Sequence, residues 1–347
     1  MQNHLVNAHW SWCDKKHIRL DFSDSIDQVG RFALWKSWRL LRIVLAVWKE
    51  RLRGKIDVLF YPPCGRSRIP FYRDVLLLFL VRWCSRRLIF QFHAGGFNLL
   101  QQKLSAIERW IARKVYRQPD AAIVLLPSLA AETRWIDPKH TFVVPNGIED
   151  CYHRVNGKHR HDIPRILFVG TLTPKKGILD AIEACRQLQE RKVPFSFLAV
   201  GDFSTEQFKK TALNLIARFN LSESFHFSGV KVGEDKWREY VCADVFCFPT
   251  YETENLPVVI LEAMQFALPI VATRWRGISD VITDGEDGFL VPVRDPAALA
   301  LKIELLVCDK ELRIRMGKMG REKYLQQYSL SQHLDKIEQV FRTVANF

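Results

Sequence analysis

One stretch decides the fold of this chain: Pro249-Thr-Tyr-Glu-Thr-Glu-Asn-Leu-Pro-Val-Val-Ile-Leu-Glu-Ala-Met264. It follows a short apolar run, Asp244 to Phe248, that is typical of a buried strand, and it continues into a helical pattern. A strand that passes through such a turn into a helix is the repeating unit of a parallel sheet, and ligands bind at the carboxyl edge of such sheets. The stretch therefore predicts an α/β protein with a ligand site at this turn.

Similar short runs of β-branched and aromatic residues alternate with longer helical patterns along both halves of the chain. The first half has four predicted strands: Ile56 to Tyr61, Leu88 to His93, Ala121 to Leu126 and Thr141 to Val144. The second half has six: Arg165 to Gly170, Phe195 to Val200, Phe225 to Phe227, Asp244 to Phe248, Ile270 to Thr273 and Phe289 to Val291. We expect two doubly wound, Rossmann-like sheets, one in each half.

A polar, strand-free segment from Asn156 to Asp162 separates the two halves. Because domain boundaries favour such segments, we predict an N-terminal domain over residues 1–156 and a C-terminal domain over residues 157–328. The last predicted helix occupies residues 329–347, with Ser329 as its N-cap, and could cross back to the N-terminal domain. A chain of 347 residues is long enough for two separate cores.

Composition excludes several classes of protein. A hydrophobic content of 48% excludes a disordered chain, and no run approaches the roughly 18 apolar residues that a membrane-spanning helix needs. The eight cysteines are scattered and include no CxxC pair, which predicts free thiols and no metal site. The sequence does not open with the apolar stretch and small-residue cleavage site of a secretion signal, so we expect a cytoplasmic location, with peripheral attachment to the inner face of the membrane as an option.

The net charge of +13 is concentrated in one half. Residues 1–160 carry 27 Lys and Arg against 13 Asp and Glu, whereas residues 161–347 carry 24 against 25. Such an asymmetry predicts an anionic partner for the first half, which could be a membrane surface, nucleic acid or a phosphorylated acceptor. We expect no nucleic acid, because the basic residues lack an aromatic platform or a helix-turn-helix pattern.

A predicted helix from Arg31 to Lys55 combines tryptophan with arginine. Its apolar residues step by three or four positions and so share one face: Leu34, Trp38, Leu41, Leu45, Trp48 and Leu52. Its basic residues lie off that face: Lys36, Arg39, Arg42, Lys49 and Arg53. This pattern suits the boundary of a lipid bilayer. It equally suits a helix that packs its apolar face into the core and leaves a solvated basic face.

Two glutamates in the deciding stretch are candidates for ligand binding. Glu254 would lie at the mouth of the crevice, and the N–H groups from about Asn255 to Pro257 onward, at the start of the helix, suit a diphosphate. Glu262 follows two turns later among apolar residues, where a hydroxyl-rich ligand such as ribose would satisfy its carboxylate. Alternatively, Glu262 pairs with a basic residue of a neighbouring element and Glu254 is a solvated turn residue.

The Glu-x7-Glu stretch resembles the donor-site motif of the retaining glycosyltransferases of family 4, which have the GT-B fold of two Rossmann-like domains that face each other across a cleft. Further segments resemble the same family in its order: Val143 to Ile148, Phe168 to Gly177, Val200 to Asp202 and Asp284 to Val291. Together these segments cover nearly all of residues 120–330. The resemblance implies sugar transfer from a nucleotide sugar linked to UDP or GDP, with no metal and no other cofactor.

The resemblance also implies roles for individual residues. It gives catalytic roles to His93, Lys176 and Glu254, and donor-binding roles to Gly170, Thr171, Gly177, Lys231, Asn255, Leu256 and Glu262. It places Gly95 and Gly96 on the acceptor side. Lys176 would stabilise charge on the leaving diphosphate, Glu262 would hold the ribose, and His93 would hydrogen-bond the sugar or phosphate. Considered alone, Lys176 could be a solvated lysine and His93 a structural histidine.

Two departures from the family pattern affect these expectations. The family usually has an arginine where this chain has Thr171, so Lys175 or an arginine of the N-terminal domain would have to replace one phosphate ligand. The family also begins with a strand and a Gly-rich loop that are not found here, so we expect an N-terminal domain that lacks its first strand. The predicted function is hexosyl transfer to a saccharide or polyprenyl-linked acceptor in the synthesis of cell-surface polysaccharide such as lipopolysaccharide. The alternatives are a degenerate, transferase-like binding subunit and a nucleic-acid-binding protein.

Overall fold

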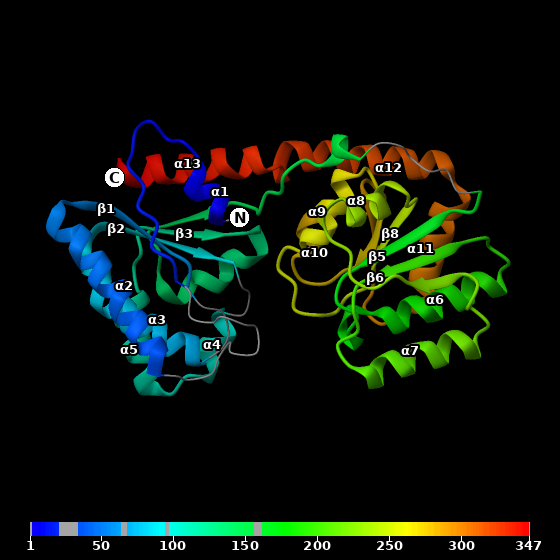
Figure 1. The fold of residues 1–347 in the computed structure, drawn as a ribbon, viewed down its shortest axis with the longest axis horizontal. Coiled ribbons are helices and arrows are strands. Elements are labelled where there is room, and N and C mark those ends of the chain that lie inside the picture. The colour runs from blue at the N-terminus through cyan, green and yellow to red at the C-terminus, as the bar shows by residue number, and fades with distance from the viewer. Residues whose placement is uncertain (1, 21–33, 64–67, 94–96, 156–161, 347) are drawn as a thin grey trace. The chain divides into compact units, whose positions relative to one another are not determined.

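The computed structural model describes residues 2–20, 34–63, 68–93, 97–155 and 162–346. By their internal contacts the residues divide into two units, Met1–Asn146 with His333–Phe347, and Gly147–Gln332. Each unit has its own parallel sheet with helices on both faces (Figure 1). The ten predicted strands are all present, with ends that shift by no more than three residues.

The division between the units comes earlier than the predicted boundary after residue 156. The Ile148 N–H donates to the Tyr328 carbonyl at 3.0 Å, and the Tyr324 hydroxyl donates to the Ile148 carbonyl at 2.9 Å. Arg321 forms an ion pair with Asp150 at 2.5 Å. These contacts attach the segment after Asn146 to the second unit, although its sequence is polar and irregular. Backbone pairing of this kind has no periodic sequence pattern.

The sheet of the first unit runs in the order β1-β2-β3-β4. This order has no reversal among the described strands, so the sheet is parallel as predicted but does not have the doubly wound order that the sequence predicted for it. Its strands are β1 (Ile56–Tyr61), β2 (Ser85–Phe92), β3 (Ala121–Val124) and β4 (His140–Val143). Its helices are α1 (Gln2–Asn7), α2 (Leu34–Arg53), α3 (Arg68–Val81), α4 (Phe97–Lys103), α5 (Ala106–Tyr116) and most of α13 (Leu330–Ala345), with the short helical turns η2 (Arg82–Cys84) and η3 (Pro127–Ile136).

Alternate residues of these strands face two different helical layers. Ile89 and Ile123 pack with Ile337 and Val340 of α13 and with the N-terminal Trp10. Their sequence neighbours on the other face pack against the crossover helices, as the ring of Phe90 does against Tyr116 of α5 at 5.8 Å. Both faces of the sheet are therefore buried, as a parallel sheet requires.

The sheet of the second unit runs in the order β10-β9-β8-β5-β6-β7. Its strands are β5 (Arg165–Val169), β6 (Ser196–Val200), β7 (Phe225–Phe227), β8 (Val245–Phe248), β9 (Ile270–Thr273) and β10 (Gly288–Val291). Its helices are α6 (Ile178–Glu190), α7 (Glu206–Arg218), α8 (Gly233–Val241), α9 (Val258–Gln265), α10 (Ile278–Val281), α11 (Pro296–Cys308) and α12 (Lys310–Lys323), with short turns η4 (Tyr152–Arg154), η5 (Pro174–Lys176) and η6 (Tyr324–Tyr328).

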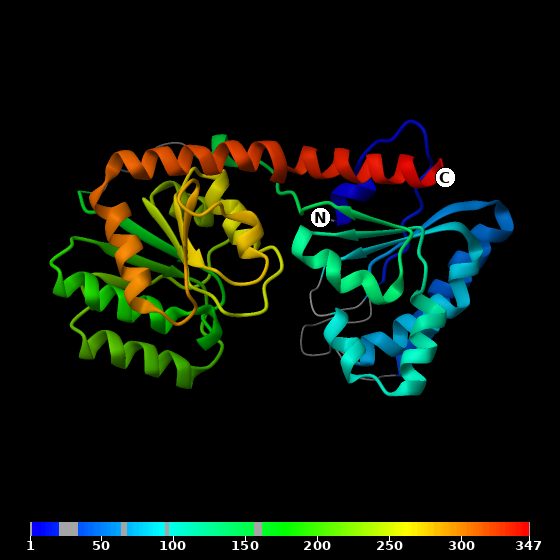
Figure 2. The ribbon, with the colours of Figure 1, turned by 180° about the vertical axis from the view of Figure 1, so that it is seen from behind.

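The strand order of the second unit reverses between β5 and β8, which confirms a doubly wound sheet. Helices α6, α7 and α11 cover one face and α8, α9 and α12 cover the other (Figure 2). At such a reversal the crossover connections leave in opposite directions, and ligands of doubly wound sheets bind outside the carboxyl ends of the two central strands. Those ends are Val169 and Phe248, next to the predicted donor-site residues.

Candidate functional site

The loop after β5 is pressed against the end of β8. Gly177 has a left-handed backbone with φ of +78°, and a β-carbon on it would lie 2.0 Å from the carbonyl oxygen of Pro249. The Tyr251 N–H donates to the Lys175 carbonyl at 2.8 Å. Only glycine permits both the backbone angle and the close approach at position 177. This contact fixes the loop that carries Lys176.

Lys176 and Glu254 form an ion pair across this edge. Their side chains are 18% and 19% exposed, and the Lys176 ammonium also lies 5.3 Å from the centre of the Phe248 ring. The structure therefore brings together two of the three predicted catalytic residues. Each of the two charges is neutralised by the other, so neither is buried without a partner when no ligand is bound. An anionic, hydroxyl-bearing ligand could then contact Lys176 through its anionic group and Glu254 through its hydroxyl groups.

The start of α9 supplies backbone donors near the same edge. Leu256 is buried, Asn255 is half-buried, and the first bond of the helix runs from the Ile260 N–H to the Pro257 carbonyl at 3.1 Å. The N–H groups that precede this bond belong to Val258 and Val259. These groups have no partner within the helix by its geometry, and the helix dipole makes them attractive to a phosphate.

Glu262 is buried, and both of its oxygens are held by α8. The Lys236 ammonium lies 2.6 Å from Oε1, and the Tyr240 hydroxyl donates to Oε2 at 2.8 Å. Burial raises the pKa of Tyr240 well above its ordinary value, and the negative Glu262 adds to that shift. The pairing with a basic residue of a neighbouring element, which the sequence left open, is therefore present. Each oxygen keeps a lone pair, so ribose binding stays a prediction.

Lys231 forms an ion pair with Glu239, and Arg165 also forms an ion pair with Glu239 at 2.9 Å. Glu239 is buried, so its two cations satisfy a carboxylate that would otherwise be costly. The predicted donor-binding role of Lys231 would require it to share this partner. Sequence reasoning missed Arg165, Lys236, Glu239 and Tyr240, although the spacing of Lys236 and Tyr240 by four residues puts them on one helix face.

Gly170 and Thr171 lie at the end of β5, as expected. The Gly170 N–H donates to the Val200 carbonyl at 2.9 Å, and the Thr171 side chain is exposed. Two further cations belong to segments at this edge and are candidates to replace the arginine that Thr171 displaces. Lys175 is exposed in the same loop, and the Arg294 guanidinium stacks 4.8 Å from the ring of Tyr251. Arg294 was missed because it lies on the turn after β10, far away in sequence.

His93 belongs to the first unit, directly after β2. Burial lowers its pKa, the nearby His333 lowers it further, and a hydrogen bond with Asn146 partly opposes both effects. The imidazole is therefore neutral near pH 7, which lets it donate from one nitrogen and accept at the other. Gly95 and Gly96, predicted on the acceptor side, lie outside the described residues.

Within the described part of the chain, no group of three or more His, Cys, Asp or Glu side chains is arranged to hold a metal ion. The same described residues contain no helix that is both long and apolar enough to span a membrane. Among the described residues at this edge of the second unit, the charges of Lys176, Lys175 and Arg294 and the first amides of α9 can receive an anion.

Comparison with known families and proteins agrees with this geometry. Residues 153–323 match the family model of the glycosyl transferases group 1. A putative colanic acid biosynthesis glycosyltransferase, WcaL of Salmonella typhimurium, is 32% identical over 47% of this chain and 41% of its own length. The alpha-D-kanosaminyltransferase of Streptomyces kanamyceticus is 25% identical over 93% of this chain and 86% of its own. The chain thus spans less than half of WcaL.

Solved structures show the same fold at low sequence identity. A glycosyltransferase from Rickettsia africae has a TM-score of 0.72 at 20% identity and covers 88% of this chain and 80% of its own. Anabaena HepE in complex with UDP-glucose has a TM-score of 0.67 at 18% identity and covers 88% of this chain and 82% of its own. Two Rossmann-like units arranged along the chain in this way are the GT-B fold.

Proposed function

Because residues 153–323 match the family model of the glycosyl transferases group 1, we propose that this chain transfers a hexosyl group from a nucleoside-diphosphate sugar to a saccharide or polyprenyl-linked acceptor. The observation that carries the proposal is the Lys176–Glu254 pair at the strand reversal, beside the first amides of α9. A diphosphate would take Lys176 and these amides, and the donor sugar would take Glu254.

The proposed chemistry uses electrostatic stabilisation of the leaving group. As the glycosidic bond breaks, negative charge grows on the diphosphate, and Lys176 with the helix amides stabilises it without a metal ion. We propose retention of configuration because the donor-site segments resemble those of the retaining family, and we propose that the leaving phosphate, rather than a carboxylate nucleophile, assists the transfer. His93 would contact the sugar or phosphate from the first unit. The proposed place of the reaction is the cytoplasmic face of a membrane, in the synthesis of cell-surface polysaccharide.

The test is donor binding followed by turnover. Mass spectrometry of the protein after incubation with a set of UDP- and GDP-linked hexoses would identify the donor. Release of nucleoside diphosphate with saccharide acceptors would then report turnover, with EDTA added to test for a metal. Glu254→Gln should abolish transfer, whereas Glu252→Gln, in the same loop, should not. If no nucleotide sugar is retained or consumed, the proposal is wrong.

A second candidate function is a binding subunit without catalysis. Thr171 leaves one edge of the crevice without the cation that the family pattern has, and Lys231 and Glu262 are engaged in pairs within the unit. A protein of this kind would retain a nucleotide sugar and never consume it. The same binding and turnover measurements separate the two functions.

A further inference from the structure

The helical layer of the first unit exposes large apolar side chains in three stripes. The first, on α2, contains Trp38, Leu41, Leu45, Trp48 and Leu52; the second, on α3 and η2, contains Ile69, Tyr72, Leu76, Phe79 and Trp83; the third, on α5, contains Ile107 and Trp110. Six of the seven exposed aromatic side chains among the described residues lie in these stripes. Exposed apolar side chains gathered in this way mark an interaction surface.

These stripes are separate from the core. Helix α2 buries Leu40, Val44 and Val47, which follow the same three- and four-residue steps one position earlier than the exposed stripe. One position is about 100° around a helix, so α2 has a core face and an adjacent exposed apolar face. Trp38 is 62% exposed and Leu52 is 88% exposed. The alternative that this stripe packs into the core is therefore wrong.

Contacts between the helices place the stripes side by side. Helix α3 packs between α2 and α5, as the layer in Figure 1 shows. The Trp48 indole donates to the Leu80 carbonyl of α3 at 3.0 Å, and the Tyr72 hydroxyl of α3 donates to Glu108 of α5. The three stripes therefore lie on neighbouring helices, and together we call them the apolar face.

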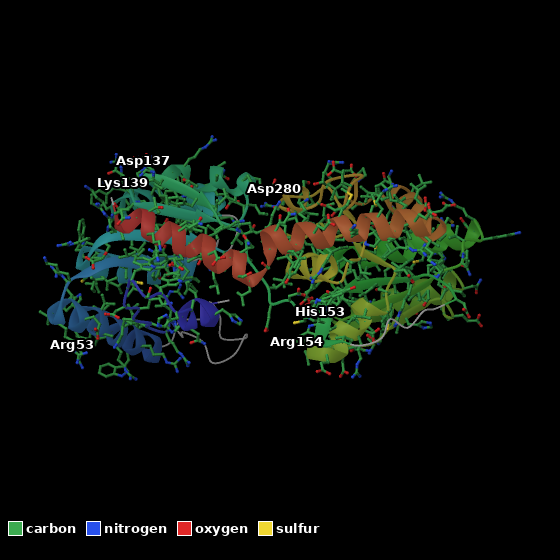
Figure 3. All side chains as sticks on the ribbon, turned by 90° about the horizontal axis from the view of Figure 1, so that it is seen from above. Arg53, Asp137, Lys139, His153, Arg154 and Asp280 are labelled. Atoms are coloured by element: carbon green, nitrogen blue, oxygen red, sulfur yellow. The ribbon has the colours of Figure 1, made fainter. Side chains whose placement is uncertain are left out.

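The apolar face lies in the most basic part of the chain. Residues 34–117 contain eighteen Lys and Arg and only four Asp and Glu. On α2, Arg42, Lys49 and Arg53 each follow a residue of the apolar stripe, so they lie about 100° further around the helix, on the side away from the core face. Figure 3 shows Arg53 at the margin of this unit. On α5, the Lys114 ammonium lies 5.9 Å from the Trp110 ring. Cations therefore border the apolar face.

We propose that the apolar face docks into the headgroup boundary of an anionic lipid bilayer. Tryptophan and tyrosine favour that boundary, and flanking lysine and arginine reach the anionic headgroups. Nucleic acid fits this surface less well, since its interfaces are polar and leucine and isoleucine stripes would remain uncovered. A second copy of the chain fits less well, because a two-fold interface would bring two strongly basic surfaces together. The proposal does not depend on sugar transfer, and vesicle binding can be measured without donor or acceptor.

The first experiment measures flotation of the purified protein with vesicles of phosphatidylcholine alone and of phosphatidylcholine with phosphatidylglycerol. We expect binding to the anionic vesicles that weakens as salt rises. Analytical sedimentation of the same sample without vesicles reports its oligomeric state. Absence of binding to anionic vesicles would overturn the proposal. It would also be overturned if substitutions in the apolar face dissociated a dimer and left vesicle binding unchanged.

The second experiment compares matched variants. Phe79→Ser, Trp83→Ser and Trp110→Ser combined should weaken vesicle binding at least about tenfold, because each removes an exposed ring from the boundary. Leu301→Ser, Leu305→Ser and Ile314→Ser, exposed on the second unit, are the control and should change nothing. The melting temperature of both variants should stay near that of the parent, so loss of folding is distinguished from loss of docking. Equal binding by the two variants would overturn the proposal.

The contribution of charge is tested separately. Arg42→Gln, Lys49→Gln and Arg109→Gln should each weaken binding about fivefold at low salt, since one cation near an anionic surface contributes that much. Lys210→Gln, Lys310→Gln and Arg315→Gln, exposed on the second unit, are the control. If the first set lowers binding to RNA and leaves vesicle binding unchanged, the partner is a nucleic acid and the proposal is wrong.

Discussion

The ammonium of Lys236 on α8 lies 2.6 Å from the buried carboxylate of Glu262 on α9. With the Tyr240 hydroxyl on the other oxygen, α8 holds Glu262 in one orientation. A side chain held in this way presents its remaining lone pairs in fixed directions, which suits recognition of two adjacent hydroxyl groups. The ion pair thus links the packing of two helices to the predicted ribose site.

Lys236→Met should destabilise the second unit by about 1–3 kcal/mol, because a buried carboxylate loses one of its partners. Urea unfolding of the full chain measures this change. Lys210→Met, exposed on α7, is the control and should have little effect. An unchanged unfolding midpoint for Lys236→Met would mean that Glu262 does not need this cation.

Glu262→Gln should weaken binding of the nucleotide sugar, because a charge-assisted bond to ribose contributes roughly 1.5–3 kcal/mol. Calorimetry with the donor measures the loss. Glu239→Gln changes another buried carboxylate of the same unit, held by Lys231 and Arg165, and is the matched control for general destabilisation. Equal donor affinity in Glu262→Gln and the parent would remove Glu262 from the donor site.

Lys176→Ala should lower turnover more than donor affinity, because its charge acts mainly on the diphosphate as the glycosidic bond breaks. Steady-state kinetics gives kcat and KM separately. Lys210→Ala, exposed on α7, is the control and should leave kcat unchanged. If Lys176→Ala kept the kcat of the parent, Lys176 would have no role in catalysis beyond its ion pair with Glu254.

Gly177→Ala should destabilise the loop strongly, because the new methyl group would lie 2.0 Å from the Pro249 carbonyl oxygen. Gly285→Ala provides a close control, since its φ of +84° resembles the +78° of Gly177 but nothing lies within 4 Å of the added carbon. We expect about 1 kcal/mol for Gly285→Ala and clearly more for Gly177→Ala. Similar unfolding midpoints for the two variants would contradict the close approach.

The first unit should lose stability as pH falls below about 6.5. Burial lowers the pKa of both His93 and His333 in the folded state, so below the ordinary histidine pKa the unfolded chain binds more protons. Their stabilising contribution is complete above about pH 6.5 and decreases as pH falls toward the folded pKa values. Melting temperatures across this range should fall less steeply for His333→Gln than for His9→Gln, an exposed histidine of the same unit. Parallel curves would contradict this assignment.

Local sequence determined the strands and the place of the site. Each strand is a short run that must bury apolar side chains on both faces, and the Glu-x7-Glu stretch follows β8 directly, so its position at the carboxyl edge comes from chain order alone. The roles of Gly177 and Lys176 came from the family resemblance of the loop after β5, which is also a local segment. Short-range patterns of this kind are sufficient because the residues involved are neighbours along the chain.

The tertiary structure decided which charges meet and which apolar faces remain exposed. Three contacts join side chains from different elements: Lys236 with Glu262, Arg294 with Tyr251, and Arg165 with Glu239. The crossover connections bring these elements together, and no local sequence pattern indicates which of them become neighbours. The stripe of Trp38 and Trp48 is equally compatible with a core face or an exposed face by periodicity alone. Only packing resolves that choice: α2 packs against α3, and Leu40, Val44 and Val47 rather than the tryptophans are buried.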